Sequence, residues 1–375
     1  MRLLDRYLLR ELLVPMGFCL SGFLLLWITS DLFVQLGEFQ RKGLLPRDIA
    51  EYYLIVLPEF LVLVLPIALL LALLYTLTNH ARHHEITAIR AAGVSLWRLA
   101  LPYFGVGLFA SLALFAANEF WVPRSYDRAK AVLSRRLPAD PRLPGPNEYQ
   151  KLCFENTRDG RRWVIGVYNA RTGDMVNVGI YPVERDSSKP WELAAARARR
   201  VDGVWTFYDV RVLKQPADPN LPPVPTLLTN VLAVPEFSET LDEINSEIKI
   251  RDNMSLRAAK KADVPIQDLL NYVKLHPKLT PSDRAWLDTK LAGRLAAPWT
   301  CLVVVLIALP FGAAGGRRNV FVGVASSIII CFIYFVLQQL GLALGTSGKL
   351  PPWLAAWFPN LSFGLVGLLL TARIR

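Results

Sequence analysis

Six long apolar runs constrain the fold of this chain more than any other feature. They fall in two blocks, residues 12–122 and 295–372, on either side of a polar middle. A membrane-spanning helix needs about 20 consecutive apolar residues, and each run is close to that length or longer. We therefore predict six transmembrane helices, three on each side of one large inserted domain. The predicted spans are Leu12–Phe33, Tyr53–Leu77, Leu99–Val122, Leu295–Ala314, Val320–Leu344 and Trp353–Leu370.

The composition agrees with a membrane protein. Hydrophobic residues make up 53% of the chain, charged residues make up 19%, and the mean hydropathy is +0.31. The first run is too long for the core of a signal peptide, and no small-residue cleavage site follows it. Aromatic side chains near the ends of the runs, such as Tyr52, Trp121 and Trp353, are typical of membrane interfaces.

Lysine and arginine are distributed unequally between the two sets of short flanks. Cytoplasmic loops carry the excess of these residues, so ten on one side against four on the other place both termini in the cytoplasm. The polar middle then faces outward. No nucleic-acid-binding motif accompanies the net charge of +11, so we expect anionic lipid rather than nucleic acid as a partner. The ten are Arg2, Arg6, Arg10, Arg82, Arg90, Arg98, Arg317, Arg318, Arg373 and Arg375, and the four are Arg41, Lys42, Arg47 and Lys349.

The polar middle predicts an all-β domain followed by a helical connector. Asp159-Gly160 and Asp202-Gly203 are hairpin signals between short strands, and the pattern predicts an antiparallel sandwich or jellyroll. Thr280-Pro281-Ser282-Asp283 is typical of a helix start, and we expect that helix to continue into the fourth span. The expected division of the chain is 1–123, 124–253 for the β domain, 254–294 for the connector, and 295–375.

Catalytic and metal-binding patterns are weak in this sequence. The densest cluster lies between His80 and Glu85, but it lacks a His-Glu-x-x-His pattern and a third defined ligand. Because it follows directly on a span, we interpret it as a solvated turn at the membrane surface. The segment Gly345–Lys349 lacks the spacing of a phosphate-binding loop. We therefore expect no catalytic residue, no metal site and no cofactor in this chain.

The segment between the second and third spans, residues 84–97, predicts a short amphipathic helix. Ile86, Ile89 and Gly93 recur at helical spacing, with Glu85 near the start and Arg90 between them. A helix of this kind docks in a groove of a cytoplasmic partner or lies on the lipid surface. The residues alone do not choose between these two uses, because both need the same amphipathic face.

Charged residues near the outer ends of the first two spans are further candidates. Arg41, Lys42 and Arg47 either bind lipid phosphates or extend into solvent, as boundary cations commonly do. Glu59 lies within the second span, where an ionisable group usually faces protein or water. It is therefore expected to contact another helix or to line a cavity.

Several short motifs, in order along nearly the whole chain, carry a family resemblance. In these motifs the sequence resembles the LptF/LptG (YjgP/YjgQ) family of permeases of the lipopolysaccharide export ABC transporter. Each motif is modest alone, and their order and spacing across six spans make the match specific. The motifs are Leu4–Leu8, Pro58–Leu61, Glu85–Ser95, Asn118–Pro123, Gly348–Pro351 and Trp357–Asn360.

The resemblance implies a permease of the bacterial inner membrane that extracts lipopolysaccharide. Two such permeases would pair, as LptF with LptG or as a homodimer, and bind a dimer of the ATPase LptB, which holds the ATP and Mg. The outer jellyroll would pass the lipid to LptC and LptA. Glu85–Gly93 would dock into LptB, Arg41 and Lys42 would face the lipid's phosphates, and the first and fifth spans would form lateral gates with the partner.

The subtype and two other functions stay open at this point. Pro58-Glu59 is closer to LptF, whereas Arg41-Lys42 and Leu4–Tyr7 are closer to LptG. A membrane-embedded enzyme that modifies glycolipids would need facing carboxylates, a metal site or a nucleophile near the outer surface. A permease or scaffold for lipoproteins is the other alternative.

Overall fold

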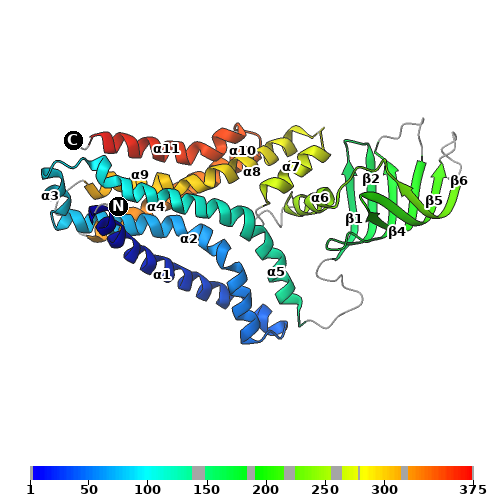
Figure 1. The fold of residues 1–375 in the computed structure, drawn as a ribbon, viewed down its shortest axis with the longest axis horizontal. Coiled ribbons are helices and arrows are strands. Elements are labelled where there is room, and N and C mark those ends of the chain that lie inside the picture. The colour runs from blue at the N-terminus through cyan, green and yellow to red at the C-terminus, as the bar shows by residue number, and fades with distance from the viewer. Residues whose placement is uncertain are drawn as a thin grey trace. The chain divides into compact units, whose positions relative to one another are not determined.

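The computed structural model describes residues 3–136, 148–183, 191–214, 224–254, 264–277, 279–313 and 320–373. The chain forms two compact units, one made of Met1–Leu133 with Thr280–Arg375 and the other of Ser134–Leu279. The first unit is helical and the second is built around a β-sheet (Figure 1). Of the arginines used for the predicted orientation, Arg2, Arg317, Arg318 and Arg375 lie outside the described residues.

Six helices of the first unit are long and apolar enough to cross a membrane, which confirms the predicted number of spans. Within a bilayer each backbone N–H and C=O must find a partner in its own segment, so long apolar runs become helices. The helices extend past the apolar runs at several ends, because polar residues continue the same backbone hydrogen bonding. They are α1 (Leu3–Arg41), α2 (Pro46–Arg82), α4 (Leu96–Ala116), α8 (Pro281–Ala296) continuing through a 3-10 turn, η2 (Ala297–Trp299), into α9 (Thr300–Ala313), α10 (Val320–Thr346) and α11 (Pro352–Arg373).

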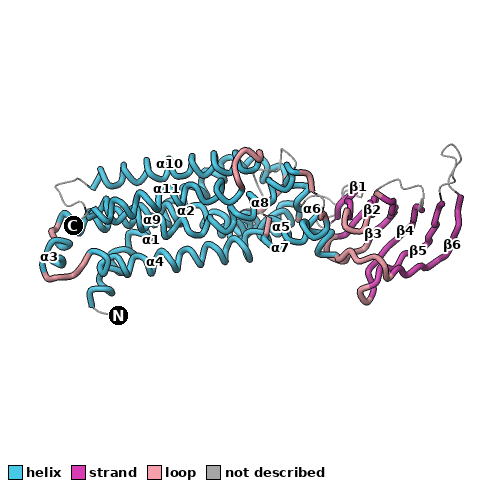
Figure 2. Tube along the Cα trace, turned by 90° about the horizontal axis from the view of Figure 1, so that it is seen from above, coloured by secondary structure: helices cyan, strands magenta, loops and turns pink. Residues whose placement is uncertain are grey.

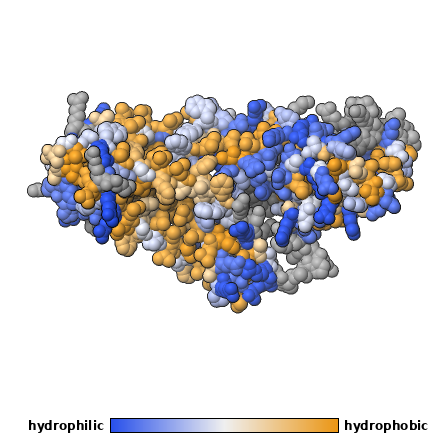
Figure 3. All heavy atoms as spheres, in the orientation of Figure 1, coloured by the Kyte–Doolittle hydropathy of each residue, from blue (hydrophilic) through white to orange (hydrophobic). Residues whose placement is uncertain are grey.

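Burial is distributed unequally among the six spans. The apolar stretch of the α8–α9 span is 56% buried, whereas those of α1 and α10 are 6% and 11% buried. Helix α9 packs against α2, α4 and α11. On α4, a Cβ atom added at Gly107 would lie 2.8 Å from Val305 Cγ2, so the absence of a side chain there permits close approach to α9. The core of the bundle therefore lies around α9, and α1 and α10 present apolar surface outward. Figure 3 shows extensive apolar surface over the helical unit on one face of the molecule.

The third span does not end at Pro123, where the apolar run stops. It continues through a π-helical turn, η1 (Ala117–Trp121), into α5 (Val122–Ser134). Ala129 and Val132 of α5 pack on Phe39 and the aromatic residues at the start of α2. That buried contact holds the extra turns of helix, and Pro123 follows closely on the π-helical turn, a local distortion of the kind that lets a helix continue through a proline.

The second unit contains one six-stranded antiparallel sheet whose strands pair in sequence order (Figure 2). Both predicted Asp-Gly hairpins are confirmed. Asn156 pairs with Arg161 around the first, and Val201 pairs with Val204 around the second. The strands are β1 (Glu148–Asn156), β2 (Arg161–Asn169), β3 (Met175–Pro182), β4 (Trp191–Val201), β5 (Val204–Lys214) and β6 (Val224–Val234).

Two helices, α6 (Leu241–Met254) and α7 (Ile266–Leu275), belong to the same unit as the sheet. One face of the sheet buries Trp163 and Trp205 in a core that also contains Ile244 and Ile248 of α6. Alternation of buried and exposed residues along the strands explains this one-sided core. The predicted helix start at Thr280 is confirmed, because its hydroxyl accepts a hydrogen bond from the Asp283 N–H, 3.2 Å away.

Candidate functional site

The predicted amphipathic segment forms helix α3 (Glu85–Ala91), between α2 and α4. His84 before it and Gly93 after it both have positive φ angles, 59° and 85°, so the chain turns sharply at each end. Ile86 is buried and Ile89 is partly buried, and both pack on the core of the helical unit. These two residues therefore anchor α3 to the bundle. Its exposed surface is formed by Thr87, Ala88, Arg90 and Ala91, followed by Gly93.

The carboxylate of Glu85 is held by two side chains from other helices. Its Oε2 atom accepts a hydrogen bond of 2.9 Å from the Tyr7 hydroxyl of α1 and lies 2.6 Å from Nδ1 of His80 on α2. The prediction of a solvated His80–Glu85 turn was wrong for His80, which is only 2% exposed, although His83 and His84 are exposed. His80 turns inward because the last turns of α2 still face the core. In the part of the chain that the structure describes, no three His, Cys, Asp or Glu side chains gather into a metal-binding group.

Further contacts fix the start of α1 at this end of the bundle, which we call the α3 end (residues 3–12 and 76–98). Asp5 Oδ2 accepts a hydrogen bond of 3.0 Å from Nη2 of Arg98 at the start of α4. The Thr76 hydroxyl of α2 donates to the Glu11 carbonyl over 3.0 Å. Leu8 and Leu12 are fully buried beside these contacts. The first turns of α1 are thus attached to the helices that flank α3.

The candidate lipid-binding cations lie where α1 ends and α2 begins, at what we call the hairpin end (residues 31–60). Lys42 Nζ forms an ion pair of 2.6 Å with Glu38 Oε1, one turn earlier. Arg41 and Arg47 are exposed, and the described residues provide no ion pair for either. The charge of Lys42 is therefore partly neutralised within the chain, whereas the two arginines present open guanidinium groups. Glu59 lies on the exposed surface of α2.

A polar and aromatic cluster fixes the geometry of the hairpin end. The Tyr53 hydroxyl donates to Asp31 Oδ2 over 3.1 Å, and Gln35 Nε2 bonds both Asp31 and the Tyr52 hydroxyl. Phe39 packs edge-on against both tyrosine rings. These contacts join α1 to α2 just before the cations. Sequence reasoning missed Asp31 and Gln35, because their partners on α2 follow from the fold rather than from any local pattern.

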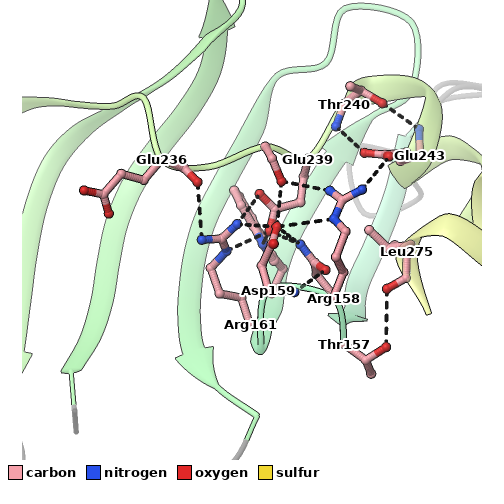
Figure 4. A network of polar contacts seen from close by, with 12 residues as sticks. Thr157, Arg158, Asp159, Arg161, Glu236, Glu239, Thr240, Glu243 and Leu275 are labelled. Carbon is pink, nitrogen blue, oxygen red and sulfur yellow. Dashed lines mark hydrogen bonds and ion pairs between the residues drawn. The ribbon is translucent and has the colours of Figure 1, made fainter. Parts of the chain in front are cut away.

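The β unit contains a dense polar network around the β1–β2 turn (Figure 4). Glu239 is fully buried, and its Oε1 atom accepts hydrogen bonds from Arg161 Nε, Asn156 Nδ2 and Trp163 Nε1 at 2.9, 2.8 and 3.1 Å. Its backbone carbonyl accepts from Trp205 Nε1 at 2.8 Å. Every polar group named here is paired, so the network ties the turn to the segment that leads into α6. It is a structural anchor rather than a reactive site.

Asp159 belongs to the same network and has a shifted pKa. Burial acts to raise the pKa of this carboxyl group. Hydrogen bonds from Ser238 and Asn156, together with the charges of Arg161 and Arg158, outweigh burial and hold the pKa below its ordinary value. Asp159 is therefore ionised at neutral pH and serves as a fixed acceptor for this turn.

Comparison with known proteins tests the resemblance seen in the sequence. A family model described as "Lipopolysaccharide export system permease LptF/LptG" matches residues 6–373. This chain belongs to the LptF/LptG family. It is 24% identical over 326 residues to the lipopolysaccharide export system permease protein LptG of Escherichia coli K12, which covers 86% of this chain and 84% of that protein. It is 22% identical over 366 residues to LptF of the same strain and of Shigella flexneri, which covers 97% of this chain and 93% of each relative.

Membership in the LptF/LptG family agrees with the architecture described above. The match runs from the first span to the last, and this LptF/LptG-family chain has six candidate spans and a separate antiparallel β-sheet. The predicted family and the predicted fold class are both confirmed. The family is one of transporter permeases, so the chain is a membrane permease. The similar identities to LptG and LptF do not assign this chain to either subtype.

Proposed function

We propose that this permease extracts lipopolysaccharide from the bacterial inner membrane and passes it to a periplasmic bridge, driven by ATP hydrolysis in a separate partner. The observation that carries the proposal is the family match over residues 6–373, together with a small, core-anchored helix at one end of the bundle and open arginines at the other. The end with the core-anchored helix would receive the movement of the ATPase partner, and the end with the arginines would contact the charged headgroup of the lipid.

The α3 end would face the cytoplasm and receive that motion. Glu85, Arg90 and Gly93 lie at or near the surface of the segment, whereas Ile86 and Ile89 are embedded in the core. Closure of an LptB-type ATPase dimer, which would hold the ATP and Mg, would press on the exposed face. Because protein cores are close-packed, the two isoleucines would pass this displacement to the surrounding helices.

The hairpin end would face the periplasm and bind the phosphates of lipopolysaccharide. Arginine recognises phosphate bidentately, which suits the open guanidinium groups of Arg41 and Arg47. Lys42 would contribute less, because Glu38 already shares its charge. The hydrogen bonds of Asp31 with Gln35 and Tyr53 would limit how far these cations move during lipid capture.

The apolar surfaces of α1 and α10 support pairing with a second permease. These two spans are the least buried of the six among the described residues, at 6% and 11%. Each must meet either lipid or protein. Pairing of LptF with LptG, or of two copies of this chain, would cover them, and opening along these helices would admit the lipid sideways.

The β unit would lie in the periplasm and pass the acyl chains onward to LptC and LptA. Its last strand, β6, supports this role because several of its large apolar side chains are exposed. An edge strand also presents unpaired backbone groups to which another strand can add. The exposed apolar residues of β6 are Val224, Leu227, Leu228 and Val231.

Reconstitution tests the transport proposal. The permease, its pairing partner, an LptB-type ATPase and LptC are placed in liposomes with lipopolysaccharide, and transfer to soluble LptA is followed by photocrosslinking. We expect transfer that requires ATP and leaves the lipid chemically unchanged. A chemically altered glycolipid would instead indicate an enzyme, and ATP-dependent release of lipoprotein alone would indicate the other kind of permease.

Thiol labelling tests the proposed orientation. Cys153 lies on β1, and the other three cysteines lie in spans and can be replaced by serine. A membrane-impermeant maleimide should label Cys153 once the outer membrane is permeabilised. A cysteine at exposed position Ala92 serves as the matched control and should react only after lysis. The reverse pattern would contradict the proposed orientation.

A further inference from the structure

The carboxylate of Glu85 makes both of its recorded contacts through one oxygen. Oε2 accepts from the Tyr7 hydroxyl at 2.9 Å and meets His80 Nδ1 at 2.6 Å. A carboxylate oxygen accepts hydrogen bonds, and the His80 ring serves as the donor of this contact in the tautomer with hydrogen on Nδ1. Within the described residues no hydrogen bond reaches Oε1, and the Glu85 side chain is 33% exposed. One oxygen is thus held by the bundle, and the side chain stays partly exposed at the end of the bundle where a partner would dock.

Three helices meet at this carboxylate. Tyr7 comes from α1, His80 from the last turn of α2, and Glu85 from the first turn of α3. The rings of Tyr7 and His80 also pack on one another, with centroids 5.7 Å apart. His80 is almost fully buried, so it offers its hydrogen from a fixed position. We call these three residues the Tyr7–His80–Glu85 junction.

The junction matters because the middle of α1 is held only by apolar packing on one face, through residues such as Met16, Leu20 and Trp27, while its other face is exposed. Leu13, Val14, Phe18 and Leu25 are exposed, and only 6% of the apolar stretch of α1 is buried. Near the α3 end, in contrast, Leu8 and Leu12 are buried and α1 is joined by hydrogen bonds to α2, α3 and α4. A displacement of α3 therefore has a direct polar route to the start of α1.

We propose that Tyr7 and His80 are positioning residues that hold Glu85 and join α3 to α1, so that motion received by α3 reaches α1 directly. The inference rests on the proposed function, in which a cytoplasmic ATPase acts on α3. It adds a second route to the one through Ile86 and Ile89, which leads into α2, α4 and the buried core. The route through the junction ends on one of the two least buried spans among the described residues.

The first test separates positioning from plain stabilisation. Tyr7→Phe removes only the hydroxyl, and His80→Phe removes the ring nitrogen while keeping an aromatic ring. In the reconstituted complex we expect the ATPase rate to stay near wild type, while the lipopolysaccharide delivered per ATP falls by about three- to tenfold, as expected for the loss of one hydrogen bond of ordinary net strength at a partly exposed side chain. His80→Gln retains a donor and should restore most of the coupling.

A matched control comes from the same helical unit. Tyr75 on α2 is 42% exposed, as Tyr7 is, and the described residues give it no hydrogen bond. Tyr75→Phe should leave delivery per ATP unchanged. If Tyr7→Phe lowers the ATPase rate and delivery in equal proportion, or behaves like Tyr75→Phe, the junction has no positioning role and the inference is overturned.

The second test needs neither lipopolysaccharide nor an ATPase. In the detergent-solubilised full chain, hydrogen exchange is measured at the backbone amides of residues 86–92 and of the first turns of α1. Tyr7→Phe should speed exchange in both segments about three- to tenfold, and Tyr75→Phe should not. Unchanged exchange in α3 overturns the inference.

The two tests distinguish failure of the inference from failure of the proposed function. If the wild-type complex fails to deliver lipopolysaccharide, the proposed function is refuted before any variant is made. If the wild type delivers it, and Tyr7→Phe speeds exchange without lowering delivery per ATP, the junction exists but does not couple α3 to transport. That outcome overturns the inference and leaves the proposed function standing.

Discussion

Replacing the buried Glu239 by alanine tests the anchor of the β unit most directly. The carboxylate is fully buried and receives hydrogen bonds from three side chains, one of them the guanidinium of Arg161, which bonds both carboxylate oxygens. Glu239→Ala removes one carboxylate partner of that cation, removes the acceptor of the Trp163 indole N–H, and leaves Asn156 Nδ2 with its hydrogen bond to Asp159. Asp159 Oδ2 still lies 2.8 Å from Nη2 of Arg161, so part of the charge stays paired.

The magnitude follows from these contacts. Removing one partner of a buried ion pair costs about 3–5 kcal/mol, and an orphaned buried donor costs about 1–3 kcal/mol. Because Asp159 retains a contact with Arg161, we expect a loss below the sum of these two terms, about 3–4 kcal/mol. A domain of this size is stable by about 5–15 kcal/mol, so the sheet should open far more often without unfolding completely.

Hydrogen exchange in the full chain measures this effect, since the amides of β1 and β2 report opening of the sheet. Glu236→Ala is the matched control. Glu236 lies three residues earlier, its side chain is exposed, and its recorded contact with Arg161 is through the backbone carbonyl, which alanine keeps. A loss of less than about 1 kcal/mol for Glu239→Ala, or an equal loss for Glu236→Ala, would refute the reasoning.

Other parts of the molecule give further predictions. Gly93→Ala forces a side chain into a φ of 85°, at a cost of about 1–2 kcal/mol, and should reduce delivery per ATP, whereas Gly105→Ala meets no atom within 4 Å and should be neutral. Arg41→Glu combined with Arg47→Glu should lower photocrosslinking to lipopolysaccharide about tenfold at unchanged protein yield, and undiminished crosslinking would contradict the phosphate assignment. The pKa of Asp159 is lowered, so the ionised carboxylate stabilises the folded β unit above about pH 4, and this stabilisation is lost as the pH falls through the folded-state pKa. Asp159→Asn should therefore make the stability of the β unit, measured by unfolding, depend less steeply on pH in the acid range.

The sequence predicted the parts of the fold that depend on local or periodic patterns. The six spans follow from run length and hydropathy, and the two hairpins follow from Asp-Gly turns such as Asp202-Gly203. The helix start at Thr280 follows from its cap. Each of these features is determined by a stretch of about 20 residues or fewer, so a single sequence is sufficient to predict it.

The contacts that organise the candidate sites depend on tertiary structure and could not be predicted in this way. Tyr7 meets Glu85 across 78 residues, and Arg161 meets Glu239 across 78 residues. His80 was expected in solvent because the apolar run ends before it, yet the last turn of α2 still faces the core. Hydropathy reports the average environment of a segment and carries no information about the direction in which a single polar residue points.

Helix α1 shows what this difference means for transport. Its apolar middle is the part that hydropathy recognises, and one face of this stretch packs on the bundle through Met16, Leu20 and Trp27 while the other face is exposed. Its polar residues, which interrupt or flank the apolar run, make the contacts that hold it: Tyr7 at the α3 end, and Asp31 and Gln35 at the hairpin end. A helix that is held at both ends and exposes one apolar face can exchange lipid for a partner helix on that face without leaving the bundle. A span-prediction rule ignores these few polar contacts, although they help to fix both ends of the helix that would have to rearrange.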